Sequence, residues 1–294
     1  MPSVRMSRAR RLLAAVVGSA TLGALLPLAA AGSAAAAAAV CTAPAKHAAV
    51  AARLSRDIKA ALSGRNDQVG VAVYDQHTGV FCKYNAYSHF DSASVVKAAI
   101  MGTVLRRAQE QHRGLTAWET SNLKAMITHS DNTAATNLWR SVGRARFQAF
   151  LNLAQMHNTH PGTGDLWGLT QITARDEVHL LDAFTDHHDA LNATWRAYAL
   201  KLMSQVTPSQ RWGVPYGAPG RTLVSNKNGW LPRATHGWRV HSIGAVTGGG
   251  RDYRLAVLTQ NNSTMSYGET TIERVAVAVH RDLGGSTTRS TAVT

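Results

Sequence analysis

The segment from Ser94 to Gln111 limits the possible folds more than any other part of this sequence. If it forms a helix, its side chains are apolar on almost every face, as Val95, Ile100 and Leu105 illustrate. A helix of this kind is normally buried at the centre of a domain. The chain has 294 residues, of which 45% are hydrophobic, so it can supply the surrounding core. We therefore expect a globular protein, and the composition excludes a fibre or a wholly disordered chain.

The elements on either side of this helix predict a mixed architecture. Helical spacing predicts helices over residues 44–63 and 269–283 and over most of 117–200, and alternation predicts strands over 69–74, 80–84, 222–227, 238–246 and 253–259. An α+β sandwich satisfies this order: a five-stranded antiparallel sheet from both chain ends, flanked by N- and C-terminal helices, with an inserted all-α domain. We expect residues 41–90 and 213–283 to form the α/β part, 91–212 the helical part and 284–294 a loose tail.

The first forty residues predict export. Arginines between residues 5 and 11 precede an uncharged stretch that ends in small residues, which is typical of a secretory signal peptide over residues 1–40. An uncleaved anchor is the alternative, and the adjacent arginines leave twin-arginine export open. Val40 occupies the position where lipidation of Cys41 requires a small residue, so we expect a secreted protein and no lipoprotein.

Two cysteines, Cys41 and Cys82, exclude a disulfide-dense scaffold and a four-cysteine zinc site. In an exported protein they are best interpreted as one disulfide that ties the mature N-terminus to a predicted strand. Two unpaired thiols are the alternative. Neither the pair His157 and His160 nor the pair His236 and His241 has a third ligand in a recognisable motif, so we predict no metal and no cofactor.

The chain is strongly basic, with 31 Lys and Arg against 17 Asp and Glu and a formal charge of +14. These charges are scattered, without a basic helix, a Cys/His finger or an aromatic RNA-binding stripe, so nucleic acid is not an expected partner. An anionic cell wall or a carboxylate-bearing small molecule or peptide fits the charge better. A basic surface that only confers solubility is the alternative. We expect a monomer without stable membrane insertion after signal cleavage.

Ser94 and Lys97 give the first chemical signal. Residues three apart share a helix face, so the hydroxyl and the amine can be neighbours. Burial and the positive end of a helix both disfavour a protonated lysine. A neutral Lys97 can take the proton of Ser94 and make it a nucleophile. Alone, this spacing is common by chance, and a capping serine with a surface-reaching lysine is the commoner explanation of it.

A second motif, Ser-Asp-Asn, occupies residues 130–132 at the end of a predicted helix. The hydroxyl of Ser130 is a candidate proton shuttle between Lys97 and a leaving group. Asn132 offers both a donor and an acceptor for a substrate amide. The intervening Asp131 would most simply order the turn.

A third motif, Lys-Asn-Gly-Trp, occupies residues 227–230 after a predicted strand. Lys227 can hold a substrate carboxylate, and Gly229 allows a ligand to approach the backbone closely. Most of the seven tryptophans are explained by core packing. Trp230 is the exception, because it follows the candidate anchor directly.

In this order, the three motifs resemble the Ser-x-x-Lys, Ser-Asp-Asn and Lys-Thr-Gly motifs of class A β-lactamases and penicillin-binding proteins. The resemblance covers most of residues 45–283, and the region around residues 227–244 is similar to secreted actinobacterial serine hydrolases of that group. It implies a serine β-lactamase/transpeptidase-like fold. It also implies roles: Ser94 as acylated nucleophile, Lys97 as acylation base, Ser130 as proton relay, Lys227 as carboxylate anchor, Asn132, Asn228 and Gly229 in substrate binding, and the backbone N–H groups of Ser94 and Trp230 as oxyanion hole.

The sequence departs from this family pattern twice. Asn228 stands where the third motif usually has Thr or Ser, so substrate preference is open. The Glu-x-x-Leu-Asn motif, whose Glu activates the deacylating water, is absent. Asp165 is the sole carboxylate in the turn-rich stretch 157–168, and it is either a shorter substitute base or a loop residue. Glu177 falls beyond this stretch, and we expect it to be structural.

The leading hypothesis is a secreted serine hydrolase that β-lactam-like or acyl-D-Ala-like amides or esters acylate on Ser94. Without the usual Glu, a long-lived acyl-enzyme is expected, because the ester has no base to activate water. The first alternative is a D,D-carboxypeptidase/transpeptidase-like penicillin-binding enzyme or an esterase. The second is a non-catalytic protein that binds the cell wall.

Overall fold

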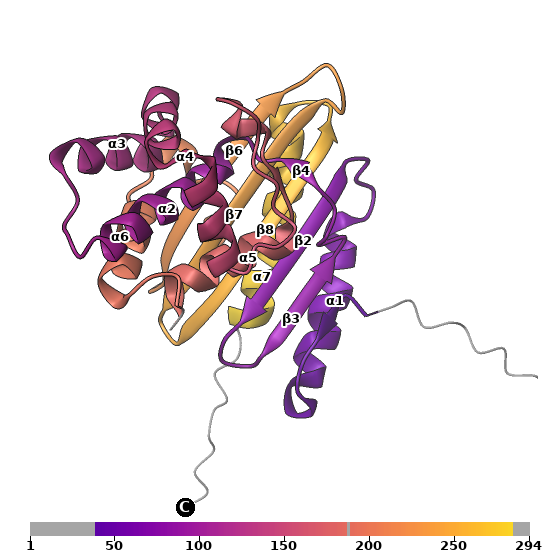
Figure 1. The fold of residues 1–294 in the computed structure, drawn as a ribbon. Helices are drawn as coiled ribbons and strands as arrows, with labels where there is room; N and C mark the ends of the chain where they lie inside the picture. The colour runs from indigo at the N-terminus through magenta and orange to yellow at the C-terminus, as the bar shows by residue number, and fades with distance from the viewer. Residues whose placement is uncertain (1–38, 187–188, 285–294) are drawn as a thin grey trace, which may run out of the picture. The chain divides into compact units, whose positions relative to one another are not determined.

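The computed structural model describes residues 39–186 and 189–284, so nearly all of the predicted signal and tail lies outside the described residues. Within the described part, the strands of the main sheet lie in the order β1-β3-β2-β8-β7-β6, and all neighbours are antiparallel (Figure 1). Their bounds are β1 Cys41–Thr42, β2 Gln68–Asp75, β3 Val80–Tyr84, β6 Leu223–Pro232, β7 Trp238–Gly248 and β8 Arg251–Asn262. A two-stranded sheet pairs β4 (Phe90–Asp91) with β5 (Gln171–Ile172).

The two faces of the main sheet carry different cores. On one face, alternate residues such as Val71 and Val73 pack with the terminal helices α1 (Ala48–Leu62) and α7 (Met265–Gly284). On the other face, smaller residues such as Ala72 pack with the helical part of the chain. Strand alternation therefore sorts the apolar side chains into two layers, and the predicted α+β sandwich is confirmed.

The helical part surrounds α2 (Lys97–Glu110), which is buried along most of its length. Around it lie α3 (Ala117–Thr128), α4 (Asn132–Leu153) and α6 (Ala193–Ser204), while α5 (Ala174–Thr185) packs against the main sheet and α6. Gly102 of α2 lets α4 come close, because a Cβ there would lie 2.2 Å from the ring of Phe150. The expectation of a central buried helix is confirmed, although the chain forms a short 3-10 helix, η2 (Ala93–Val96), before α2 begins. Among the described residues, no helix is long and apolar enough to cross a bilayer.

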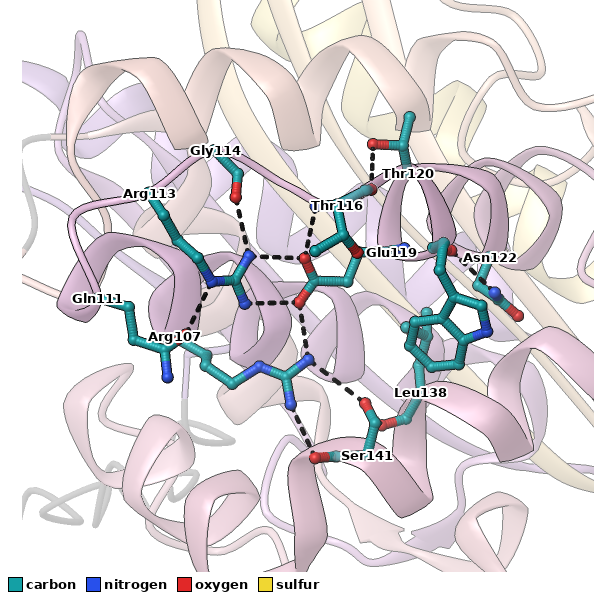
Figure 2. A network of polar contacts seen from close by, with 11 residues as sticks. Arg107, Gln111, Arg113, Gly114, Thr116, Glu119, Thr120, Asn122, Leu138 and Ser141 are labelled. Carbon is teal, nitrogen blue, oxygen red and sulfur yellow. Dashed lines mark hydrogen bonds and ion pairs between the residues drawn. The ribbon is translucent and has the colours of Figure 1, made fainter.

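A network of polar contacts joins α2, α3 and α4, which it reaches through a hydrogen bond from Arg107 to the carbonyl of Ser141 (Figure 2). Glu119 is buried and binds two guanidinium groups, at 2.8 Å from Arg107 and 2.7 Å from Arg113. It also accepts the backbone N–H of Thr116, whose side chain caps the backbone of Glu119 in return. This arrangement is a capping box with two added ion pairs, and it holds the loop before α3 in place.

The predicted disulfide is confirmed: Cys41 and Cys82 are bonded across the β1–β3 pair. The sheet has one strand more than the predicted five, because β1 is only two residues long and leaves no alternating pattern in the sequence. Strand β6 extends to Pro232 and so contains the third motif, which the sequence analysis had placed after a strand.

Candidate active site

Ser94 lies in η2, directly after β4, and is partly exposed to solvent. Two bonds fix this segment: the N–H of Ser92 donates to the carbonyl of Thr170 at 2.8 Å, and that of Val95 to the carbonyl of Ser92 at 3.1 Å. Ala93, immediately before Ser94, has a φ of 47°, a left-handed conformation that a side chain disfavours. Backbone strain of this kind tends to occur where function requires a particular geometry.

Lys97 is buried, and its amine nitrogen meets groups of the second motif. Nζ lies 2.6 Å from the carbonyl oxygen and 3.2 Å from Oγ of Ser130, and 2.7 Å from Oδ1 of Asn132. Burial lowers the pKa of Lys97 from 10.5 to about 7, against the opposing charge of Asp131. A substantial share of Lys97 is therefore neutral near neutral pH, as general-base chemistry requires.

Ser130 lies between two lysines. Its Oγ is 3.2 Å from Nζ of Lys97 and 3.1 Å from Nζ of Lys227. The turn that presents it is left-handed at Ser130, with a φ of 59°, and Asp131 caps α4 by accepting the N–H of Ala134 at 2.7 Å. A hydroxyl can donate one proton and accept others, so Ser130 can pass a proton between the two amines.

Lys227 is fully buried in β6 and donates to the backbone carbonyl of Asn228 at 2.8 Å. Burial and the nearby charge of Lys97 lower its pKa well below the ordinary lysine range. The charge of Lys97 thus disfavours the protonated form of Lys227. An incoming anion would relieve this repulsion and favour the protonated amine.

Gly229 brings the third motif against the first. A Cβ at this position would lie only 2.8 Å from the backbone nitrogens of Ser94 and Val95. Glycine is therefore required for β6 to touch the start of η2. Trp230, which follows, is half-buried with its ring 6.1 Å from that of Trp212. The predicted oxyanion donors, the N–H groups of Ser94 and Trp230, thus belong to two backbone segments in direct contact.

His241 supports this contact from the neighbouring strand, and the sequence analysis considered it only as a metal ligand. It pairs with Gly229 across β6 and β7. Its Nδ1 accepts the N–H of Thr259 at 3.1 Å, so its Nε2–H donates to the carbonyl of Asp91 at 2.8 Å. Burial lowers the pKa of His241 to about 4 and keeps the ring neutral. The ring holds the chain just before Ser94.

The structure gives Asn228 another role than the predicted contact with substrate. It is fully buried, and its amide nitrogen lies 3.0 Å from the carbonyl oxygens of Gln210 and of Trp212. Alternation along β6 turns it away from the face that carries Lys227 and Gly229. Asn228 therefore braces the segment 210–212.

The structure also argues against Asp165 as a deacylating base. Its carboxylate is exposed and forms a two-pronged ion pair with Arg140 of α4, with distances of 3.0 and 3.1 Å from Nε. Hydrogen bonding to Arg140 lowers the pKa of Asp165, which weakens it as a base. Glu177 is completely buried in α5, without a hydrogen-bond partner among the described residues, and burial raises its pKa.

From the stretch 157–168, the side chain that reaches the site is that of Trp167. The centre of its indole ring lies 4.9 Å from Nζ of Lys97. The sequence did not single out Trp167, because seven tryptophans give no signal that separates a ring in the core from one in a site. The position of Trp167 in the stretch that contains Asp165 was the available clue.

The fold and the arrangement of the three motifs fit the β-lactamase-like serine hydrolase fold, and sequence comparison agrees. The model of the β-lactamase enzyme family matches residues 53–120 and 115–283, and the chain belongs to that family. The fold is similar to that of the extended-spectrum β-lactamase TLA-1, with a TM-score of 0.70, 20% identity and coverage of 78% of this chain and 98% of that one. A class A β-lactamase from Bacteroides cellulosilyticus gives a TM-score of 0.68 at 19% identity, covering 79% and 97%.

Curated relatives correct one expectation. Proteins named "Putative lipoprotein LppW" from Mycobacterium tuberculosis and Mycobacterium bovis are 26% identical over 196 residues, which span 64% of this chain and 62% of theirs. We expected no lipoprotein from Val40 alone, and the name of these relatives contradicts that exclusion. One residue before a cysteine was too narrow a basis for it.

Proposed function

We propose that this protein is a serine hydrolase that β-lactam-like or acyl-D-Ala-like amides and esters, carrying a carboxylate, acylate on Ser94. The observation that supports this most is the position of Ser130 Oγ, within hydrogen-bond distance of both Lys97 and Lys227. Two buried amines with lowered pKa values around one hydroxyl form a proton-transfer chain. The contact between Gly229 and Ser94 adds the backbone donors.

The first step is binding. A substrate carboxylate that binds beside Ser130 brings a negative charge close to Lys97 and Lys227. This charge favours the protonated form of Lys227. The amine and the Ser130 hydroxyl then both donate to the carboxylate. Asn132, which accepts from Lys97, keeps its amide hydrogens for the substrate.

The second step is acylation. Neutral Lys97 takes the proton of Ser94, and Oγ forms a bond to the substrate carbonyl carbon. The N–H groups of Ser94 and Trp230 stabilise the resulting oxyanion. The carbon–nitrogen or carbon–oxygen bond to the leaving group then breaks. The leaving atom receives the proton of Ser130, which Lys97 replaces.

Ser94→Ala tests the proposal. We expect it to abolish covalent labelling by a fluorescent penicillin, while Ser121→Ala, an exposed serine on α3, labels as the wild type does. Undiminished labelling of Ser94→Ala would refute the proposal. A wild-type protein that forms no adduct in intact-mass measurement would favour the non-catalytic binding protein.

Within this proposal, slow release as in a penicillin-binding enzyme is favoured over efficient β-lactam hydrolysis. Asp165, the one candidate base that the sequence suggested, is paired with Arg140, and Glu177 is buried in the interior. Steady nitrocefin turnover without a trapped adduct would instead identify a β-lactamase.

A further inference from the structure

Trp167 belongs to a short helix that packs against the one that carries Ser94. This helix, η3 (Trp167–Leu169), is joined to the start of η2 by a hydrogen bond from Oγ of Ser92 to the carbonyl of Trp167, at 3.4 Å. A Cβ on Gly168 would lie 3.8 Å from the carbonyl oxygen of Ala93. The backbone of η3 is therefore in contact with the nucleophile's own segment.

The indole of Trp167 is fixed at its far end as well. Its Nε1–H donates to Oγ1 of Thr136 at 3.1 Å. Thr136 lies one turn after Asn132 on α4, so the helix that carries Asn132 also holds the ring of Trp167 in place. Ser130, Asn132 and the ring of Trp167 together surround the amine of Lys97.

Loop anchoring explains why this stretch presents a ring and not a carboxylate. Nε1 of Trp139 donates to the carbonyl of Gly164 at 2.8 Å, and Arg140 binds Asp165. Both anchors belong to α4, and both precede Trp167 in the loop. The carboxylate is thereby held at the exposed side, and the indole is the next large group that the loop directs inward.

We propose that Trp167 shields the Ser94–Lys97 pair from water and so slows hydrolysis of the acyl group. This inference rests on the proposed function. In hydrolysis, the water oxygen bonds to the acyl carbon, the bond from that carbon to Ser94 Oγ breaks, and a water proton reaches Oγ through Lys97. A water must therefore approach beside Lys97, where the indole lies. Exclusion of water from a site is a recognised protection of reactive intermediates.

Time-resolved intact mass after mixing with benzylpenicillin tests the shielding. We expect Trp167→Ala to be acylated and then to lose its adduct about ten-fold faster than the wild type. Trp167→Phe keeps a ring over Lys97 and should retain a long-lived adduct. Leu166→Ala is the matched control, because that neighbouring side chain is 56% exposed. An adduct on Trp167→Ala that lasts as long as that of the wild type would overturn the inference.

A second measurement tests whether Trp167 shields Lys97 from water and does not require acylation. In protein labelled with 13C-lysine, NMR titration reports the pKa of Lys97. Water entry in Trp167→Ala should raise this pKa from about 7 toward the ordinary value, whereas Leu166→Ala should leave it unchanged. An unchanged pKa in Trp167→Ala contradicts the shielding. If the wild type forms no adduct, the proposed function fails. The titration then shows by itself whether Trp167 keeps water away from Lys97.

Discussion

The buried charged groups at the two ends of α2 have opposite surroundings. Near its last turn, Arg107 joins Arg113 around the carboxylate of Glu119 (Figure 2). At its first residue, Lys97 shares a hydroxyl with a second lysine. A cation is favoured at the C-terminal end of a helix and disfavoured at the N-terminal end. The first cluster therefore holds paired charges, and the second holds two amines around one neutral hydroxyl.

The pKa values express the same contrast. Hydrogen bonding to Arg113, with smaller help from Thr116 and Arg107, lowers the pKa of Glu119 to about 2, so its charge persists at any ordinary pH. Burial lowers that of Lys97 to about 7, so its charge is lost within the physiological range. Both side chains are buried, but Glu119 is hydrogen-bonded to two guanidinium groups, whereas the charge of Asp131 only partly offsets the effect of burial on Lys97.

The largest expected effect comes from Lys97→Met. Without the base, acylation by a fluorescent penicillin should fall about a thousand-fold. Because the folded-state pKa of Lys97 is below its unfolded value, the folded state resists protonation there, and wild-type stability falls as pH drops toward 7. The free energy of unfolding of the variant minus that of the wild type should therefore be larger at pH 6 than at pH 9. Urea unfolding of both proteins at the two pH values measures this difference. Lys124→Met, at an exposed position, is the control. Retained acylation would remove Lys97 from the mechanism.

The next effect concerns the other end of the helix. Glu119→Gln leaves two guanidinium groups without their carboxylate and should lower the free energy of unfolding by about 3 kcal/mol. Glu110→Gln, which breaks the exposed pair with Arg106, should cost less than about 0.5 kcal/mol. The Glu119 contribution is present above its unfolded pKa of 4.5 and is lost as pH falls toward 2. If both variants lost the same free energy of unfolding at pH 7, Glu119 would not stabilise the fold more than an exposed ion pair does.

The smallest effect is a pH dependence. Acylation needs neutral Lys97, so its rate should rise with pH around a midpoint of about 7 and be about ten-fold lower at pH 6 than at pH 8. Glu119→Gln should shift the thermal midpoint without moving this kinetic midpoint. A kinetic midpoint that moves with Glu119 would show that the two ends of α2 are coupled.

The sequence sufficed for the parts of the site that depend on local spacing. Ser94 and Lys97 are one turn apart, and the Ser-Asp-Asn turn carries its own cap in Asp131. The apolar pattern likewise predicted the central helix and the order of layers. The encounter of Lys227 with Ser130 joins residues 97 positions apart, and it was predicted only through a family resemblance.

The remaining features of the site depend on the direction in which individual side chains point, and residue spacing does not determine that direction. Whether Asn228 faces a substrate or a loop is decided by the register of β6 with β7. Trp139 and Arg140, on a different helix, anchor the loop at Gly164 and Asp165, before Trp167 approaches the site. His241 acts through the backbone at Asp91, and backbone acceptors leave no trace in a sequence.

The contact at Gly229 has a consequence for any attempt to redesign this protein. With 2.8 Å between a hypothetical Cβ and two backbone nitrogens, even alanine would push β6 and the serine's segment apart. Libraries aimed at new substrates should therefore keep residue 229 constant and vary side chains around it, such as Trp212 and Trp230. The sheet thus fixes the position of Ser94 because residue 229 has no side chain.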